Sequence, residues 1–280
     1  MLSKGVKLML LSTLVMTTMQ TFVKFVSHIP ATEVVFFRAA ISLVMSYAML
    51  YRQNVNIWGK PENRPTLWMR GIFGTLALVM VFATFQNMPL ASALLLHYLA
   101  PIFTALLAAI FLKERIRPIQ WFFFLLCFAG IGMIKGFDSR VETLYFVLGI
   151  VGALLAAAAY TMIGKLKGKE NPVVIVFYFP FVAMPITGLY SYFNWVTPQG
   201  TDWLFLLGIG ILTQIGQILL TKAYQTDQAN KVASANYTGI IYGLLYGFFL
   251  FGELFQWEVY VGMGLVLLGV FLNVTYRGKK

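Results

Sequence analysis

Ten apolar segments, each about 20 residues long, follow one another along this 280-residue chain with short polar connections between them. An α-helix of that length spans the hydrocarbon core of a bilayer. Turn-forming residues such as Pro30, Pro89 and Pro172 separate the segments. The sequence therefore predicts an all-α polytopic membrane protein. Its ten transmembrane helices are expected near residues 6–26, 32–51, 67–86, 90–112, 118–135, 144–165, 173–193, 202–222, 231–251 and 258–276.

The composition excludes several other classes of protein. Hydrophobic residues make up 59% of the chain and charged residues only 11%, whereas a soluble domain carries about 25% charged residues. An ordinary soluble enzyme, a disordered protein and a nucleic-acid-binding domain are therefore excluded. Cys127 is the one cysteine, so the chain has neither a disulfide framework nor a thiolate metal site. Ten spans use most of the residues, and no second domain fits beside this single membrane domain.

The net charge of +11 is an orientation signal rather than a footprint for nucleic acid. With the N-terminus in the cytoplasm, the cytoplasmic side receives nearly all lysines and arginines, Arg64 and Arg70 among them. The opposite side receives only Lys135 and Arg140. This asymmetry is the positive-inside rule. We expect a multi-pass protein in a lipid bilayer, with both termini cytoplasmic and no nucleic-acid partner.

The chain contains an internal repeat. Moving the sequence against itself by 139 residues aligns 66–134 with 205–273, and polar residues coincide as well as apolar ones. The matched pairs include Gly71 with Gly210, Gln86 with Gln225, Tyr98 with Tyr237, Glu114 with Glu253, Gly130 with Gly269 and, with two more residues of offset, Lys24 with Lys165. Residues 1–140 and 141–280 then hold five spans each. Because five is odd, the second half inserts upside down, and inverted repeats are typical of secondary transporters.

Short motifs in both halves resemble a known family. They are Phe37-Arg38-Ala39 in the second span, Pro101 followed by Glu114-Arg115 at the end of the fourth, and Phe251-Gly252-Glu253 at the end of the ninth. This pattern resembles the EamA family of the drug/metabolite transporter superfamily. The resemblance implies ten helices with both termini cytoplasmic, and a central cavity lined mainly by helices 1–4 and 6–9. It also implies peripheral helices 5 and 10 and a location in a bacterial cytoplasmic (inner) membrane.

Two cations lie inside the predicted spans and are candidate substrate-binding residues. Ionisable groups within a membrane are costly and mark functional sites by default. Arg38 lies about two turns into the second span, and its planar guanidinium suits a carboxylate or a phosphate. Lys24 lies near the end of the first span, on the same side of the membrane. The structural alternatives are that Lys24 extends to the membrane interface and that Arg38 pairs with Glu33.

Two aligned dipeptides form a second group of candidate substrate-binding residues. His97-Tyr98 in the fourth span aligns with Asn236-Tyr237 in the ninth, and each pair lies about two turns from its own membrane face. Such a placement suits residues that line a cavity between two halves. A continuous fourth helix places His97 and Pro101 on one face because they are four residues apart. Hydrogen bonding between helices is the alternative role for these polar groups.

Neutral amides form the third group of candidates. Gln214 and Gln217 share one face of the eighth span, and Gln20 lies in the first span. An amide that faces lipid is unfavourable, so these side chains should point into the bundle, towards either the solute or another helix. Tyr160 and Tyr178 are secondary candidates.

Two carboxylates are candidate gating residues. Glu114 and Glu253 end the fourth and ninth spans on opposite membrane faces. We expect each to form a salt bridge that opens and closes during a transport cycle. The alternative is a solvated charge at a helix end.

Absent motifs narrow the function further. The chain has no phosphate-binding loop and no His-Glu-x-x-His, Gly-x-Ser-x-Gly or Cys-x-x-Cys motif. We therefore expect no catalytic residue, metal or cofactor, and no transport driven by ATP. A non-transporting membrane subunit is disfavoured by the internal repeat.

The candidate residues also predict the class of solute. Cations, amides and aromatic rings, with no Asp or Glu at mid-depth, favour a small anionic or zwitterionic metabolite (amino-acid-like, nucleotide-like or aromatic) moved by alternating access. The alternative is a translocator of lipids or lipid headgroups. Gly262 and Gly269 in the tenth span either form the face of a homodimer or pack within the bundle.

Overall fold

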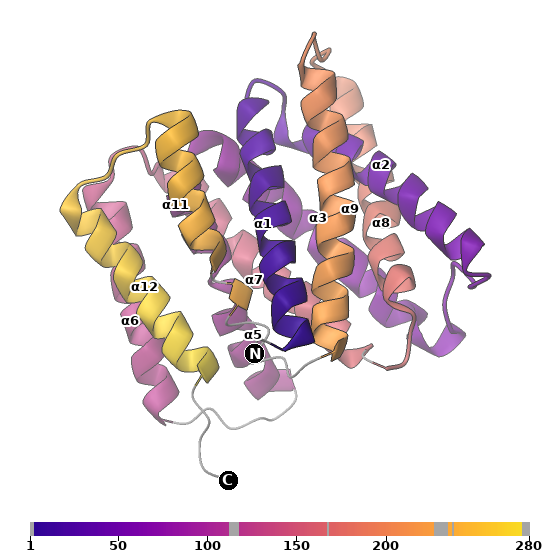
Figure 1. The fold of residues 1–280 in the computed structure, drawn as a ribbon, viewed down its shortest axis with the longest axis horizontal. Helices are drawn as coiled ribbons and strands as arrows, with labels where there is room; N and C mark the ends of the chain where they lie inside the picture. Colours follow the sequence, from indigo (N-terminus) through magenta and orange to yellow (C-terminus); the bar gives the residue numbers. More distant parts are fainter. Residues whose placement is uncertain (1–2, 112–117, 167, 227–234, 237, 276–280) are drawn as a thin grey trace.

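A computed structural model describes residues 3–111, 118–166, 168–226, 235–236 and 238–275. The described chain is helical, and the helices pack side by side into one bundle (Figure 1). The elements are α1 (Lys4–Phe25), α2 (Ala31–Arg52), the 3-10 helix η1 (Pro61–Asn63), α3 (Arg64–Asn87), α4 (Leu90–His97), α5 (Ala100–Phe111), α6 (Pro118–Phe137), α7 (Thr143–Lys165), α8 (Pro172–Phe193), α9 (Asp202–Thr226), α11 (Thr238–Phe251) and α12 (Trp257–Thr275).

The helices match the expected membrane spans. Of the described helices, α1, α2, α3, α6, α7, α8 and α9 are long and apolar enough to cross a membrane. Shorter apolar helices at Leu90–Thr104, Thr238–Phe251 and Trp257–Gly269 occupy the fourth, ninth and tenth expected spans. Each expected span therefore contains a helix, and the prediction of an all-α polytopic membrane protein is confirmed.

Prolines define where several helices begin. Pro30 and Pro89 directly precede α2 and α4, and Pro172 is the first residue of α8. A proline costs little there because the N–H groups of a first turn have no partner within the helix. At α8 the side-chain oxygen of Asn171 also accepts the backbone N–H of Val173, at 2.8 Å. Turn chemistry in the sequence thus fixes these boundaries.

The fourth expected span is two helices rather than one. α4 ends at His97 and α5 begins at Ala100. Between them the N–H of Leu99 bonds to the carbonyl oxygen of Leu96, three residues back rather than four. Pro101 lacks the N–H that would bond back to His97, so the helix loses a hydrogen bond at this point. The fourth span is therefore interrupted directly after His97. That His97 and Pro101 share one face stays a prediction.

The two halves pack about an approximate two-fold axis. Helix α1 packs against α9, and helix α3 packs against α7. By sequence α1 corresponds to α7 and α3 corresponds to α9, so exchanging the two halves converts the first helix pair into the second. Two further pairs of counterparts pack on each other: α2 on α8, and α6 on α12 at one edge of the bundle (Figure 1). Helix α4 packs on α11, which corresponds by sequence to α5. Since each half has five crossings, α7 begins on the face where α1 ends. The predicted architecture of ten transmembrane helices in two inverted five-helix repeats is confirmed.

The α6–α12 contact shows the same symmetry residue by residue. A Cβ atom at Gly130 would lie 2.4 Å from the carbonyl oxygen of Gly262, and one at Gly269 would lie 2.7 Å from the carbonyl oxygen of Phe123. Gly262 and Gly269 are the repeat counterparts of Phe123 and Gly130, so the two contacts are copies of one another. Gly262 and Gly269 thus pack within the bundle on α6, which is the second of the two alternatives considered from the sequence. A homodimer stays a prediction.

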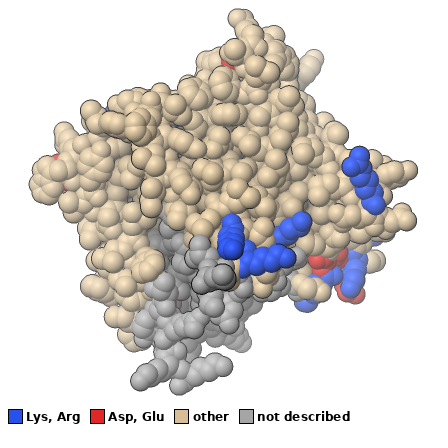
Figure 2. Space-filling model, in the orientation of Figure 1, with Lys and Arg blue, Asp and Glu red and all other residues tan. Residues whose placement is uncertain are grey.

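The lateral surface of the bundle is apolar. Figure 2 shows one broad face that is almost free of charge, with Lys and Arg side chains gathered towards its lower and right-hand margins. Large exposed apolar side chains include Leu204 on α9 and Leu245 and Phe249 on α11, as suits contact with lipid. In Figure 1, α1 begins and α12 ends on the lower side, so both ends of the described chain lie on one face. That this face is cytoplasmic stays a prediction.

The close approach of α6 and α12 yields a stability prediction. Gly130→Ala forces the two backbones apart and should lower the free energy of unfolding by roughly 1 to 3 kcal/mol, as overpacking does. Gly132→Ala is the matched control because nothing lies within 4 Å of a Cβ at that position. It should be neutral or slightly stabilising. Thermal unfolding of the purified variants in detergent measures both effects, and equal Tm values for the two variants would contradict the prediction.

Candidate functional site

Arg38 lies buried in α2, about 10 Å along the helix from its first residue. Only 2% of its surface is exposed. Its Nε donates a hydrogen bond to the hydroxyl oxygen of Thr213 on α9, at 2.9 Å, whereas its Nη1 is buried without a hydrogen-bond partner. Glu33, the partner considered from the sequence, instead accepts the backbone N–H of Val196 at 3.0 Å. An Arg38–Glu33 ion pair is therefore not formed.

A second arginine accompanies Arg38 in the interior. Arg70 on α3 is only 4% exposed, although the sequence placed it among the cytoplasmic cations. That interpretation is wrong about the environment of Arg70, because its side chain enters the bundle. The guanidinium carbons of Arg38 and Arg70 lie 4.8 and 5.0 Å from the centroid of one aromatic ring, that of Phe179 on α8. The signal that could have revealed Arg70 is its position inside the third expected span, 67–86.

Glycine provides the space for Arg70. A Cβ atom at Gly74, one turn further along α3, would lie 2.2 Å from Nη1 of Arg70 and 2.7 Å from the ring of Phe179. A Cβ at Gly71 would lie 2.5 Å from the side chain of Val182 on α8. These two glycines let α3 approach α8 closely and let the Arg70 side chain lie over Phe179. The local sequence of α3 thus positions the second guanidinium.

Neither arginine has an acidic partner within the described residues. The ion pairs found in that part of the chain involve other cations, and the Nε of Arg70 is buried without a hydrogen bond. The neighbouring ionisable side chain is that of Tyr160 on α7, which lies close enough to interact electrostatically with both. Buried arginines are normally paired. This pair can therefore accept negative charge from a ligand.

Tyr98 and His97 lie at the break between α4 and α5. Tyr98 is 5% exposed, and a Cβ at Gly239 on α11 would lie 1.9 Å from its hydroxyl oxygen, so Tyr98 reaches across to the second half. Nδ1 of His97 is buried without a hydrogen-bond partner. Discontinuous helices with polar groups at the break form solute sites in many secondary transporters. Both residues stay candidates for binding.

Other polar candidates join helices of the two halves. Gln214 on α9 is fully buried, and its amide exchanges hydrogen bonds with the hydroxyl groups of Ser42 and Ser46 on α2, at 2.5 to 3.2 Å. The Oδ1 of Asn236 accepts the hydroxyl of Thr13 on α1 at 3.1 Å. These bonds correspond to the helix-packing alternative considered from the sequence. The amide nitrogen of Gln214 also lies 3.9 Å from the sulfur of Met49, a weak acceptor on α2.

Of the remaining candidates, two lie within the described residues and two do not. Gln20 on α1 is 9% exposed, and its side-chain oxygen is buried without a hydrogen-bond partner. Gln217 on α9 is half-buried, one turn from Gln214. Tyr237 and Glu114 lie outside the described residues.

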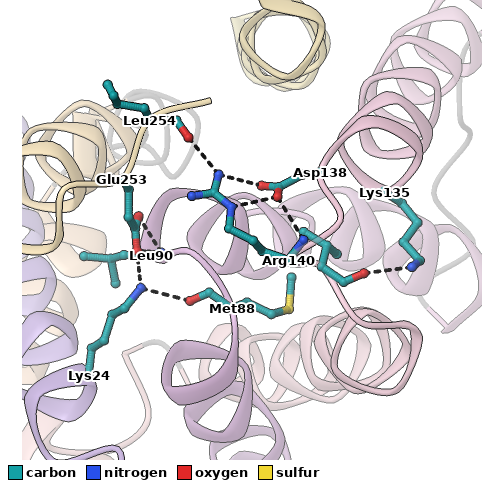
Figure 3. A network of polar contacts seen from close by, with 9 residues as sticks. Lys24, Met88, Leu90, Lys135, Asp138, Arg140, Glu253 and Leu254 are labelled. Atoms are coloured by element: carbon teal, nitrogen blue, oxygen red, sulfur yellow. Dashed lines mark hydrogen bonds and ion pairs between the residues drawn. The ribbon is translucent and has the colours of Figure 1, made fainter. Parts of the chain in front are cut away.

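Lys24 and Glu253 form an ion pair that joins the halves at one end of the bundle (Figure 3). Glu253 lies between α11 and α12, and its carboxylate accepts a hydrogen bond from Nζ of Lys24 on α1. Its two oxygens also lie 2.9 and 3.0 Å from the backbone nitrogen of Leu90, the first residue of α4, and accept its N–H. Lys24 also donates to the carbonyl oxygen of Met88 at 3.1 Å. We call Lys24, Leu90 and Glu253 the Glu253 latch. It lies at the end of the bundle opposite to the one at which α1 begins.

A second contact lies beside the latch. Arg140, between α6 and α7, donates hydrogen bonds to the carboxylate of Asp138 and, at 3.0 Å, to the carbonyl oxygen of Leu254. Figure 3 shows both contacts next to each other. The hydrogen bond with Asp138 raises the pKa of Arg140, which keeps the guanidinium charged. The connections α6–α7 and α11–α12 thus meet at the same end of the bundle.

Removal of the latch charge should destabilise the protein. Glu253→Gln leaves the amine of Lys24 without its carboxylate, and we expect a loss of roughly 1 to 3 kcal/mol in the free energy of unfolding because a charged hydrogen bond is lost at a site of low exposure. The matched control is Glu142→Gln, an exposed carboxylate before α7 without a side-chain capping bond. Thermal unfolding in detergent compares them, and a Glu253→Gln variant as stable as the control would exclude a structural role for the pair.

The chain is similar to known transporters over nearly its whole length. The pseudopaline exporter CntI of Pseudomonas aeruginosa (strain UCBPP-PA14) is 32% identical over 256 residues, which cover 90% of this chain and 89% of the exporter. Solute carrier family 35 member G1 of Mus musculus is 28% identical, with 88% and 72% covered. The riboflavin transporter of Vibrio cholerae serotype O1 is 23% identical, with 90% and 85% covered.

A comparison with solved structures and a comparison with family models agree with these similarities. A solved crystal structure of a protein that is 17% identical superposes with a TM-score of 0.66 and covers 97% of this chain and 93% of its own. The model of the EamA-like transporter family matches residues 3–135 and again 143–275. The division of the chain at residue 140 stays a prediction. Since the two matches together span nearly all of the sequence, the chain belongs to the EamA-like transporter family.

Proposed function

We propose that this membrane transporter moves a small anionic or zwitterionic metabolite by alternating access across a bacterial cytoplasmic membrane. The observation that carries the proposal is Arg38, a guanidinium buried between α2 and α9 that has one hydrogen bond and no acidic partner among the residues that the structure describes. Burying an uncompensated charge is expensive. A negatively charged group of the solute would supply the missing partner.

The surroundings of Arg38 fit a small organic anion better than a bare cation. The aromatic ring of Phe179 lies against the guanidinium, and the rings of Tyr98 and Tyr160 belong to the same region of the bundle. No carboxylate lies near enough to Arg38 or Arg70 to form an ion pair within the described chain. A cationic solute would therefore meet like charge. Two relatives are named for small organic solutes, pseudopaline and riboflavin.

Alternating access is supported by the symmetry and by the latch. The two inverted halves meet along α1–α9 and α3–α7, so a rocking motion about the approximate axis would open one face and close the other. The Glu253 latch joins α1, α4 and the α11–α12 connection at one end of the bundle, and this contact would close that face. Lys165, the repeat counterpart of Lys24, is exposed at the end of α7 on the other face. Breaking the latch is then part of every cycle.

The test combines ligand identification with one pair of variants. Amino acids, nucleotides, flavins, sugars and phospholipid headgroups are screened by thermal shift on the purified protein, and the hit is used for transport into proteoliposomes. A ligand at 100 times its Kd should stabilise the protein by about 2.7 kcal/mol. We expect Arg38→Ala to abolish transport and the thermal shift while leaving the folded yield intact.

Arg52→Ala is the matched control, since Arg52 is exposed at the end of the same helix. It should transport normally. Normal transport by Arg38→Ala would refute the binding role of Arg38. Stabilisation by headgroups alone, together with headgroup-dependent lipid scrambling, would replace the metabolite transporter with a lipid translocator.

A further inference from the structure

We propose that the solute carries two anionic groups, one bound by Arg38 and the other by Arg70, with its middle portion against Phe179; this inference rests on the proposed transport function. It makes the substrate class a small dianion, such as a dicarboxylate. It also makes Arg70 a residue that determines specificity, which no sequence motif indicates.

The first argument is the geometry of the two guanidinium groups. Both lie against the ring of Phe179, at 4.8 and 5.0 Å from its centroid, so their central carbons are about 10 Å apart at most. Each guanidinium retains a buried nitrogen without a hydrogen-bond partner, Nη1 in Arg38 and Nε in Arg70. Two donors within that distance of each other can each bind one carboxylate of a single small molecule.

The second argument is charge balance. Arg38 and Arg70 are close enough to repel one another, and burial removes both from water. A single negative charge placed between them would offset one positive charge and leave the other uncompensated. Two negative charges neutralise the pair. The balance of charge in this part of the bundle therefore favours a dianion over a monoanion.

The third argument is that both guanidinium groups are held in place before any solute binds. Thr213 holds Nε of Arg38 at 2.9 Å. Gly74 leaves the space in which the Arg70 side chain lies, and a Cβ there would displace Nη1 of Arg70 or the ring of Phe179. Preorganised donors bind a ligand without the cost of ordering long side chains. A simple packing role for Arg70 would not require this arrangement.

The test compares dicarboxylates with monocarboxylates of equal chain length. Binding of succinate, glutarate and adipate, and of butanoate, pentanoate and hexanoate, is measured by calorimetry on the purified full-length protein. We expect at least one dicarboxylate to bind about tenfold or more tightly than its monocarboxylate, because a second charged hydrogen bond is formed. Arg70→Gln should remove that preference, and Arg64→Gln, an exposed arginine at the start of the same helix, should keep it.

Two further variants distinguish a specific loss of dicarboxylate binding from a general loss of folding. Arg70→Lys keeps the charge but not the planar fork, and Gly74→Ala keeps Arg70 but displaces it. Both should weaken dicarboxylate binding more than monocarboxylate binding, whereas a purely structural defect would weaken both equally.

The outcomes separate this inference from the proposed function. Equal binding of mono- and dicarboxylates that depends on Arg38, or a dicarboxylate preference that survives Arg70→Gln, would overturn the dianion inference and leave an anion transporter. Absence of binding by all six acids would also overturn it. If Arg38→Ala in addition transports normally, the proposed function fails as well.

Discussion

Two positive charges are buried in the interior of this apolar bundle, and the arrangement of the surrounding helices depends on them. The guanidinium groups of Arg38 and Arg70 both lie near the ring of Phe179, and neither forms an ion pair with a carboxylate among the described residues. In a membrane, water cannot offset such charges unless a cavity admits it. The helices around them supply only partial compensation, through Thr213 and an aromatic face. The bundle is therefore built around a deficit of negative charge that a solute can fill.

The sequence alone predicts the architecture well because membrane folds obey few rules. Apolar length marks the spans, prolines such as Pro30 and Pro172 mark where helices begin, and the repeat implies inverted halves. The sequence also predicts that Arg38, Gln20 and Gln214 are buried, because a charged or amide side chain is costly against lipid. The pairing of Glu253 with Lys24 joins two residues that the sequence had singled out separately.

The failures have physical causes that a single sequence does not display. Arg70 is close to a span end, and whether such a side chain extends to water or into the bundle depends on which helix it faces; the glycines at 71 and 74 bring α8 close enough to enclose it. The partners of Gln214 depend on the contact between α2 and α9, which no local pattern specifies. The break after His97 follows from one missing N–H at Pro101, although many prolines only bend a helix.

The short helix α4 has one more consequence. It contains eight residues, about 12 Å of helix, with Leu90 at one end in the latch and His97 at the other end beside Tyr98. Helical hydrogen bonds make such a segment stiff, and the regular pattern of these bonds is interrupted between His97 and Ala100. A movement of Leu90 on release from Glu253 would therefore be transmitted along α4 to His97 and Tyr98.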